Sequence, residues 1–322
     1  MSGADWRPTA SRAQLRRRAE LLARARQFFS ARGVMEVDTP LLVNAAVSDV
    51  HIASAEVRLA GASRAPLFLH TSPEYAMKRL LAAGSGDIYQ ICHVVRGFES
   101  GPLHNPEFTL IEWYRLGFSL GRLMDEVEAL ARELLGEFAS ARRVERLSYA
   151  AAFERELGLD PFTATLGQLR AAATPLGFAA RSDNRDEWLE LLMGSLIGPR
   201  LGRGALTFVD AYPASQAALA QLEPRDLRTA QRFELYCEGI ELANGFHELA
   251  AAAEQRARFE ADNAERRRSG LPVAPLDERL LAALAAGLPD CCGVALGFDR
   301  TLMLASGAGA IDEVLAFPSA RA

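Results

Sequence analysis

The stretch Gly293–Arg300 reads GVALGFDR, and the interpretation of this 322-residue chain starts from it. Its small and apolar residues predict a strand from Gly293 to Phe298, with the last helix directly after it. Small side chains let a ligand approach a strand closely, and this strand delivers Arg300 on the first turn of the helix. An arginine in that place can hold the triphosphate tail of a nucleotide. Glycine-rich turns from strand to helix are common, so this stretch alone does not identify a nucleotide-binding site. The interpretation also depends on other parts of the chain.

A second informative region combines Arg96–Glu99, RGFE, with His104–Phe108, HNPEF. A strand, a loop and a second strand predict a hairpin here. Arg96 at the end of the first strand can grip a phosphate with its planar guanidinium, and Phe108 at the start of the next can stack on a base. His104 between them can reach another phosphate. The alternative is a surface hairpin that holds only a salt bridge and one packed phenylalanine.

The third region, Phe233–Glu248, reads FELYCEGIELANGFHE and is rich in carboxylates. Glu234 and Glu241 would face opposite sides of a single strand, unless a turn at Gly239 intervenes. Carboxylates that converge repel each other unless a cation lies between them, and Mg²⁺ with ATP oxygens suits such a pair. The alternative is an exposed acidic strand, but apolar residues flank Glu241 and argue against full exposure.

The composition is that of a globular protein, with 49% hydrophobic and 24% charged residues. The sequence has no apolar run of about 18 residues, which a membrane span needs, and no recognisable secretory signal. Its four cysteines lack metal-ligand spacing, which favours free thiols in a reducing cytoplasm. The net charge of −5 lowers the expectation of a nucleic-acid partner held through phosphates. We therefore expect a cytoplasmic protein with no membrane partner.

The order of expected elements predicts one mixed α+β domain over residues 1–322. Helices are expected at 11–32, 75–81, 119–138 and 250–269, and strands at 34–43, 66–70, 87–95, 108–114, 206–212 and 232–242. Residues 147–201 are interpreted as a helical insertion. Pro40 cannot donate to a β-ladder, so its strand is expected at a sheet edge or an interface.

Taken in order, these regions resemble the motifs of the class II aminoacyl-tRNA synthetases. Residues 33–40, GVMEVDTP, resemble motif 1, the Arg96 and Phe108 region resembles motif 2, and Gly293–Arg300 resembles motif 3. The stretches TSPE (71–74), HNPEFT (104–109), EWY (112–114) and NGFHEL (244–249) are similar to the lysyl subgroup. YPASQA (212–217) and GVALG (293–297) resemble its stand-alone paralogues, which attach (R)-β-lysine to elongation factor P.

The resemblance covers the chain from about residue 11 to its end. It implies a class II catalytic domain, with a mostly antiparallel sheet flanked by helices, that forms a homodimer through motif 1. It also implies ATP and Mg²⁺ as substrate and cofactor. Arg96 would hold the α-phosphate and the substrate carboxylate, and Arg300 and His104 would contact the outer phosphates. Phe108 would stack on adenine, with Glu99 nearby, and Glu234 and Glu241 would bind Mg²⁺.

For the amino acid, the resemblance implies a lysine-type substrate. Glu74 would receive the amino group near the substrate carboxylate, and Asn244 would orient that carboxylate. Glu112, Tyr114 and Glu248 would receive the distal ammonium. Such a site would reject a substrate without that ammonium, because buried carboxylates would be left unpaired.

The chain departs from the tRNA enzymes at three points. Phe98 stands where they have a glutamate, and Glu99 follows it. Ala295 stands where they usually have glycine, and its methyl group would crowd an α-amino acid and favour the shifted amino group of a β-lysine. Only about ten residues precede the first helix, so no anticodon-binding domain is expected, and the acceptor would be a lysine side chain of elongation factor P rather than tRNA.

Two alternatives remain at this point. An amino-acid–ammonia ligase of the asparagine-synthetase type would need cationic groups for aspartate, whereas Glu112 and Glu248 would repel a second carboxylate. A non-catalytic paralogue should have lost the phosphate and metal groups, whereas Arg96, Arg300 and the Glu234–Glu241 pair are present.

Overall fold

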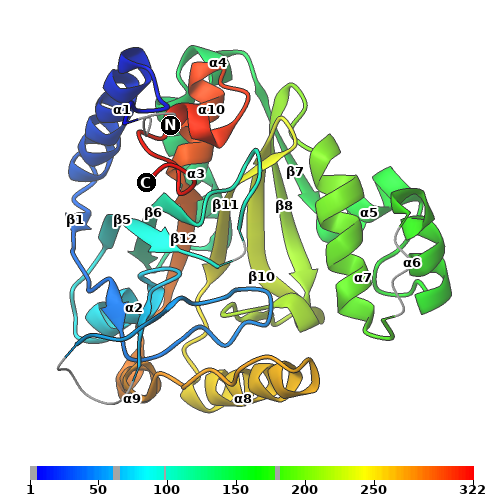
Figure 1. Cartoon of the computed structure of the whole chain (residues 1–322). Coiled ribbons are helices and arrows are strands. Elements are labelled where there is room, and N and C mark those ends of the chain that lie inside the picture. The colour runs from blue at the N-terminus through cyan, green and yellow to red at the C-terminus, as the bar shows by residue number, and fades with distance from the viewer. Residues whose placement is uncertain (1–5, 61–65, 98, 178–181) are drawn as a thin grey trace, which may run out of the picture.

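The computed structural model describes residues 6–60, 66–97, 99–177 and 182–322, and it has a large central sheet (Figure 1). In this part of the chain the sheet has nine strands and the order β1-β5-β6-β12-β11-β10-β8-β7, with β9 paired to β10. The strands are Met35–Glu36 (β1), Ile88–Val95 (β5), Glu107–Leu116 (β6), Cys291–Gly297 (β12), Ile240–His247 (β11), Asp226–Cys237 (β10), Ala205–Pro213 (β8), Arg143–Ser148 (β7) and Leu222–Glu223 (β9). Only the β1–β5 and β7–β8 pairs among these described strands are parallel. The predicted α+β fold with a mostly antiparallel sheet is therefore confirmed.

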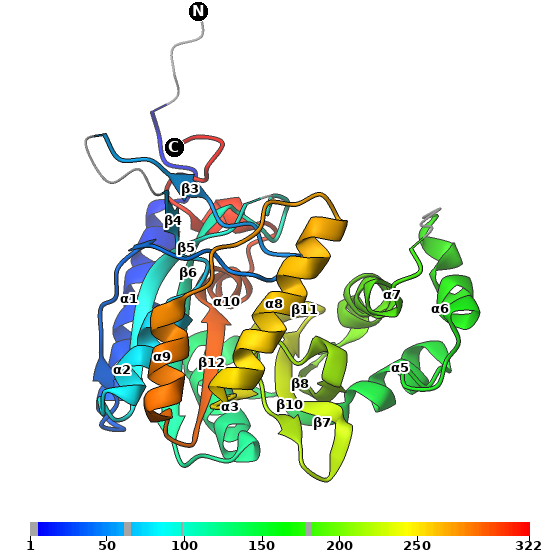
Figure 2. The ribbon, with the colours of Figure 1, turned by 90° about the horizontal axis from the view of Figure 1, so that it is seen from below.

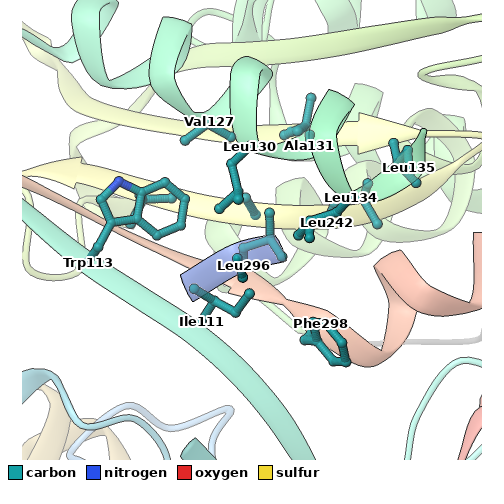
Figure 3. Packing of buried hydrophobic residues seen from close by; sticks show 14 of the residues in the cluster. Ile111, Trp113, Val127, Leu130, Ala131, Leu134, Leu135, Leu242, Leu296 and Phe298 are labelled. Atoms are coloured by element: carbon teal, nitrogen blue, oxygen red, sulfur yellow. The ribbon is translucent and has the colours of Figure 1, made fainter. Parts of the chain in front are cut away.

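Three helices pack on one face of this sheet: α1 (Arg12–Ser30), α3 (Leu120–Leu135) and α10 (Phe298–Ser306). Ser11 caps α1 and Ser119 caps α3, each through a side-chain oxygen that accepts a backbone N–H. The helical spacing of Val127, Leu130 and Leu134 forms one apolar stripe on α3. Figure 3 shows this stripe over the strands, where it buries residues such as Ile111, Trp113, Leu242 and Leu296. The strands alternate, so their other side chains face away from this core.

The opposite face carries α2 (Glu74–Ala82), α8 (Ala252–Arg268) and α9 (Glu278–Gly287), which lie in front of the sheet when the molecule is seen from below (Figure 2). Met77 and Leu81 of α2 pack with Leu280 and Leu284 of α9. A smaller sheet precedes α2 in the chain, with the order Leu42–Val43 (β2), Leu67–Leu69 (β4) and Glu56–Val57 (β3). These elements enclose the cavity described below.

The expected helical insertion corresponds to α5 (Tyr149–Leu157), α6 (Leu166–Ala173) and α7 (Arg185–Leu192). These helices lie to one side of the sheet, beyond β7 and β8 (Figure 1). They share a core of their own around Tyr149, Phe153 and Trp188. The expected start at residue 147 was slightly wrong, because β7 runs to Ser148 and pairs with β8.

Several expected elements differ from the structure. The strand expected at 34–43 consists of β1 and β2 with irregular chain around Pro40 between them, although β1 does lie at a sheet edge. The helix expected at 119–138 ends at Leu135, because Gly136 takes a positive φ of 59° and a short helix, Glu137–Ser140 (α4), follows. Helix α9 was not predicted.

The strand expected at 232–242 is in fact a hairpin of β10 and β11. Its turn is Glu238-Gly239, whose φ angles of 51° and 77° are both positive, as in the tight turns that suit a twisted hairpin. A side chain at Gly239 would also meet the Pro199 carbonyl oxygen at 2.5 Å. The turn places Glu234 and Glu241 on neighbouring strands. No helix in the described part of the chain is long and apolar enough to cross a membrane.

Candidate active site

A cavity of about 490 Å³ lies between the central sheet, α2 and the loop at residues 40–54. Strands β6, β11 and β12 form its floor, since their alternate residues face away from the α3 core. All of the predicted site residues except Glu234 line it, namely Glu74, Arg96, Glu99, His104, Phe108, Glu112, Tyr114, Glu241, Asn244, Glu248, Ala295 and Arg300. Phe98 lies outside the described residues. The structure therefore brings distant parts of the sequence to one site, while the role of each residue stays a prediction.

One end of the cavity is cationic. The Arg96 Nε donates to the Thr71 carbonyl at 3.2 Å, and the Arg96 guanidinium lies 5.2 Å from the centre of the Phe108 ring. Glu99 is 3.7 Å from Arg96, close enough for an ion pair. Arginine forks held by backbone carbonyls are suited to phosphate, and Phe108 offers a ring beside them for stacking.

Backbone carbonyls also hold the side chain of Arg300, which lies at the start of α10. Its Nη1 donates to the Glu241 carbonyl at 3.1 Å and its Nε to the Leu103 carbonyl at 3.2 Å. Its Nη2 lies 2.6 Å from Nε2 of His104. Burial, followed by the charge of Arg300, lowers the pKa of His104, so the neutral imidazole accepts a hydrogen bond from Arg300. The two arginines and the histidine thus present neutral and cationic donors to the same end of the cavity.

The two carboxylates predicted to hold Mg²⁺ lie in different surroundings. Glu234 accepts hydrogen bonds from Arg232 at 2.5 Å and from the Tyr236 hydroxyl at 2.6 Å, so both of its oxygens are already engaged. The Glu241 carboxylate accepts no hydrogen bond from any residue in the described ranges. Burial and the nearby charge of Glu234 raise the pKa of Glu241 to about 7. A half-buried carboxylate that accepts no hydrogen bond, beside the side chain of Arg300, fits a divalent cation.

No cluster of three or more histidine, cysteine, aspartate or glutamate side chains in the described chain could hold a metal by itself. Mg²⁺ does not require such a cluster, since it usually takes one or two carboxylates and completes its shell with phosphates and water. The residues present therefore fit Mg²⁺ that arrives with ATP, with Glu241 as its direct ligand. Glu234 is bonded to Arg232 and Tyr236 in this structure, and its role as a second Mg²⁺ ligand stays a prediction.

The other end of the cavity is anionic. Glu112 accepts hydrogen bonds from the Ser72 hydroxyl at 2.6 Å and the Tyr114 hydroxyl at 2.7 Å. Burial and the charge of Glu74 raise the pKa of Glu112 to about 7. Burial also raises the pKa of Glu248 to about 8, although a neighbouring ammonium acts against this rise.

That ammonium belongs to Lys78, whose side chain is fully buried behind the cavity wall. Its Nζ donates to Glu74 at 2.7 Å and lies 2.5 Å from an oxygen of Glu248. Burial alone would lower the pKa of Lys78, but Glu248 and Glu74 raise it above its ordinary value, so this side chain is charged. Three carboxylates, including Glu112, thus share one resident cation.

Two residues of β12 shape the floor between these carboxylates. A side chain at Gly293 would meet Glu248 and Tyr114 atoms at 2.4 Å each, so only glycine leaves both groups in place. Ala295 pairs with Glu112 on one side and Asn244 on the other, which puts its methyl group between the two. The Asn244 oxygen accepts from Arg232 at 3.3 Å, and this leaves the Asn244 amide hydrogens for a ligand.

Sequence reasoning missed Lys78 and Arg232. Both could have been found from simple spacing: Lys78 is four residues after Glu74 on α2, and Arg232 lies two residues before Glu234 on the same strand face. The contact between Lys78 and Glu248 joins segments that are distant in the sequence, so no local sequence pattern predicted it.

Comparison with known proteins agrees with this geometry. Residues 2–321 match the family described as tRNA synthetases class II (D, K and N), and the chain belongs to that family. It is 51% identical over 325 residues to the elongation factor P–(R)-β-lysine ligase of Edwardsiella ictaluri, with 99% of each chain covered. It is 49% identical, with the same coverage, to the proteins of that name from Klebsiella pneumoniae subsp. pneumoniae and Salmonella dublin. Within the class II family, the chain therefore belongs to the group of elongation factor P–(R)-β-lysine ligases.

Proposed function

We propose that this protein uses ATP to convert (R)-β-lysine to its adenylate, with release of pyrophosphate, and then transfers the β-lysyl group to a lysine side chain of elongation factor P. The names of its relatives support this activity. The observation that carries it is the charge balance at the anionic end of the cavity. Glu74, Glu112 and Glu248 contribute three negative charges when ionised, against the single positive charge of Lys78. A substrate with two ammonium groups neutralises the remainder.

The cationic end supports the adenylation step. The substrate carboxylate is already ionised and attacks the α-phosphate, so this step needs no general base. Arg96 would hold the α-phosphate and the carboxylate together, and Arg300 with His104 would bind the outer phosphates as pyrophosphate leaves. Mg²⁺ held by Glu241 would neutralise phosphate charge when bound with ATP.

The position of Ala295 supports the β-amino acid over the α-amino acid. Its methyl group lies between Glu112 and Asn244, where the α-amino group of lysine would approach the strand. A β-amino group is one carbon further from the carboxylate and can avoid this methyl group while still reaching Glu74.

The ammonia-ligase alternative is less consistent with the site. Aspartate has a second carboxylate, which would face Glu112 and Glu248 rather than cations. The non-catalytic alternative is less consistent with Arg96 and Arg300, because both line the cavity and are held there by backbone carbonyls, an arrangement that suits phosphate binding.

The test is ATP–pyrophosphate exchange with Mg²⁺, with (R)-β-lysine, L-lysine or L-aspartate as the amino acid. Each reaction is then offered elongation factor P or lysine tRNA as acceptor. The proposal expects the fastest exchange with (R)-β-lysine and transfer to elongation factor P alone. Exchange with aspartate only would support the ammonia ligase, and no exchange with any amino acid would support the non-catalytic alternative.

We further propose a cytoplasmic homodimer that does not use tRNA. The free thiols of the four cysteines suit a reducing compartment. Strand β1 lies at an edge of the sheet, and Met35 on it and Leu41 after it are 49% and 43% exposed. Exposed apolar residues at a sheet edge are suited to an interface. Sedimentation of the wild-type protein and of the Met35→Glu variant tests the homodimer. We expect a dimer for wild type that the variant weakens, and a monomeric wild-type protein would refute the homodimer.

A further inference from the structure

Lys78 is the only lysine in a chain with 36 lysine and arginine residues. Its side chain has no exposed surface, and it bonds to carboxylates from two distant elements, Glu74 at the start of α2 and Glu248 after β11. It does not line the cavity, so it lies behind the two carboxylates as seen by a substrate. At every other basic position the chain has arginine, which indicates that this position requires an ammonium group.

We propose that Lys78 is a positioning residue that stabilises the charged form of the Glu248 carboxylate and holds Glu248 and Glu74 at a fixed separation, and thereby sets the preference of the cavity for an amino acid with two ammonium groups. This inference rests on the proposed function and extends it to a residue that makes no contact with the substrate.

The geometry explains why a lysine suits this place. An ammonium is a compact charge with three donors, and it can bond to two carboxylates that approach from different directions. A guanidinium is planar and wider, and it favours paired bonds to one carboxylate. The site is closed, with Lys78 fully buried and the Glu248 side chain 1% exposed, so a wider group would push the carboxylates apart.

The surrounding charges explain why the cation is needed. The titratable groups that face Lys78 are Glu74 from α2, Glu112 from β6, Glu248 after β11 and Cys291 from β12. Burial raises the pKa of the Cys291 thiol, which stays neutral. Glu112 and Glu248 are buried, and they repel each other and the nearby Glu74 carboxylate. Lys78 lowers the pKa of both Glu112 and Glu248, so without it these two carboxyls would hold their protons to higher pH. Protonated carboxyls lose most of their attraction for the substrate ammonium groups.

The first test compares Lys78→Met, which is similar in length but uncharged, with wild type in the pyrophosphate-exchange assay. We expect the KM for (R)-β-lysine to rise about tenfold or more at pH near 7, with the KM for ATP changed less than about threefold. The rise should shrink as the pH is increased, because the carboxyls ionise again at higher pH. Lys78→Arg keeps the charge, so its KM should rise without this recovery at high pH.

Arg115→Met is the matched control. Arg115 is also a buried cation between two carboxylates, Asp87 and Glu126, but it does not line the cavity or touch the predicted site. We expect it to lower the melting temperature without raising the KM for (R)-β-lysine. If Lys78→Met behaves like this control, Lys78 has a structural role only and the inference is overturned.

A second measurement does not depend on variants that fold. Because the chain has one lysine, protein labelled with ¹⁵N and ¹³C lysine gives a single side-chain signal. We expect this signal to remain that of a charged ammonium at pH values above the ordinary lysine pKa of about 10.4. We also expect it to shift when (R)-β-lysine is added. A neutral amine near neutral pH, or a signal insensitive to the amino acid, would contradict the inference. If wild type lacks exchange activity altogether, the proposed function fails instead.

Discussion

Gly293 offers the sharpest test of how the substrate ammonium is recognised. A methyl group at this position would lie 2.4 Å from an oxygen of Glu248 and 2.4 Å from a ring carbon of Tyr114. Ordinary contacts between such atoms are about 3.5 Å or more, so Gly293→Ala must move the Glu248 carboxylate or the Tyr114 ring by about 1 Å. A misplacement of that size costs on the order of 100-fold in rate, or about 2.7 kcal/mol of transition-state stabilisation.

The assay is pyrophosphate exchange, with kcat and KM measured separately for (R)-β-lysine and ATP. We expect kcat/KM for the amino acid to fall about 100-fold and the KM for ATP to change little, since Arg96 and Arg300 lie at the other end of the cavity. Overpacking should also lower the free energy of unfolding by about 1–3 kcal/mol, which a denaturant titration measures.

Gly297→Ala is the control on the same strand. Its added methyl group would find its nearest neighbours, in Arg300 and Leu242, at 3.8 Å, so it fits without movement. The KM for the amino acid should stay within about threefold of wild type. A folded Gly293→Ala protein with unchanged kcat/KM for (R)-β-lysine would refute the assignment of Glu248 and Tyr114 to the substrate ammonium.

Four further predictions concern the same cavity. Because the pKa of Glu112 is raised to about 7 and that of Glu248 to about 8, kcat/KM for (R)-β-lysine should increase as pH rises from about 6 to about 8.5 and these carboxyls ionise. Ser72→Ala removes a hydrogen bond that lowers the Glu112 pKa, so it should move the acid limb of this profile to higher pH; an unmoved limb would exclude Glu112 as its source. Ala295→Gly should raise the rate of pyrophosphate exchange with L-lysine relative to that with (R)-β-lysine. An unchanged ratio of the two rates would contradict the explanation that the Ala295 methyl group crowds an α-amino group. Glu241→Gln should raise the Mg²⁺ concentration for half-maximal exchange about tenfold or more, whereas an unchanged requirement would show that the metal binds elsewhere.

Much of the fold and the composition of the site could be predicted from the sequence, because both depend on local patterns. Ser11 and Ser119 mark the starts of α1 and α3, and Gly239 marks the turn that separates Glu234 from Glu241. Helix α9 was missed even though Asp277 caps it in the usual way, by accepting two backbone N–H groups.

The remaining features depend on contacts between distant segments. Nothing near Glu248 in sequence indicates that its carboxylate would meet the ammonium of Lys78. The resemblance implied that Glu234 and Glu241 both bind Mg²⁺, and this stays a prediction. The sequence did not show that Arg232 and Tyr236, on the same strand face as Glu234, would bond to both of its oxygens. The sequence shows which charges are present, and packing decides which of them are already paired.

The burial of Lys78 also affects where the activated amino acid can react. Aminoacyl-adenylates acylate free amines, and arginine side chains stay protonated and do not react in this way. Since the only lysine of the chain has no exposed surface, an adenylate that leaves the cavity finds no lysine on the enzyme itself. The protein thus makes a reagent for lysine side chains while offering none of its own, and every lysine-linked product must form on another molecule.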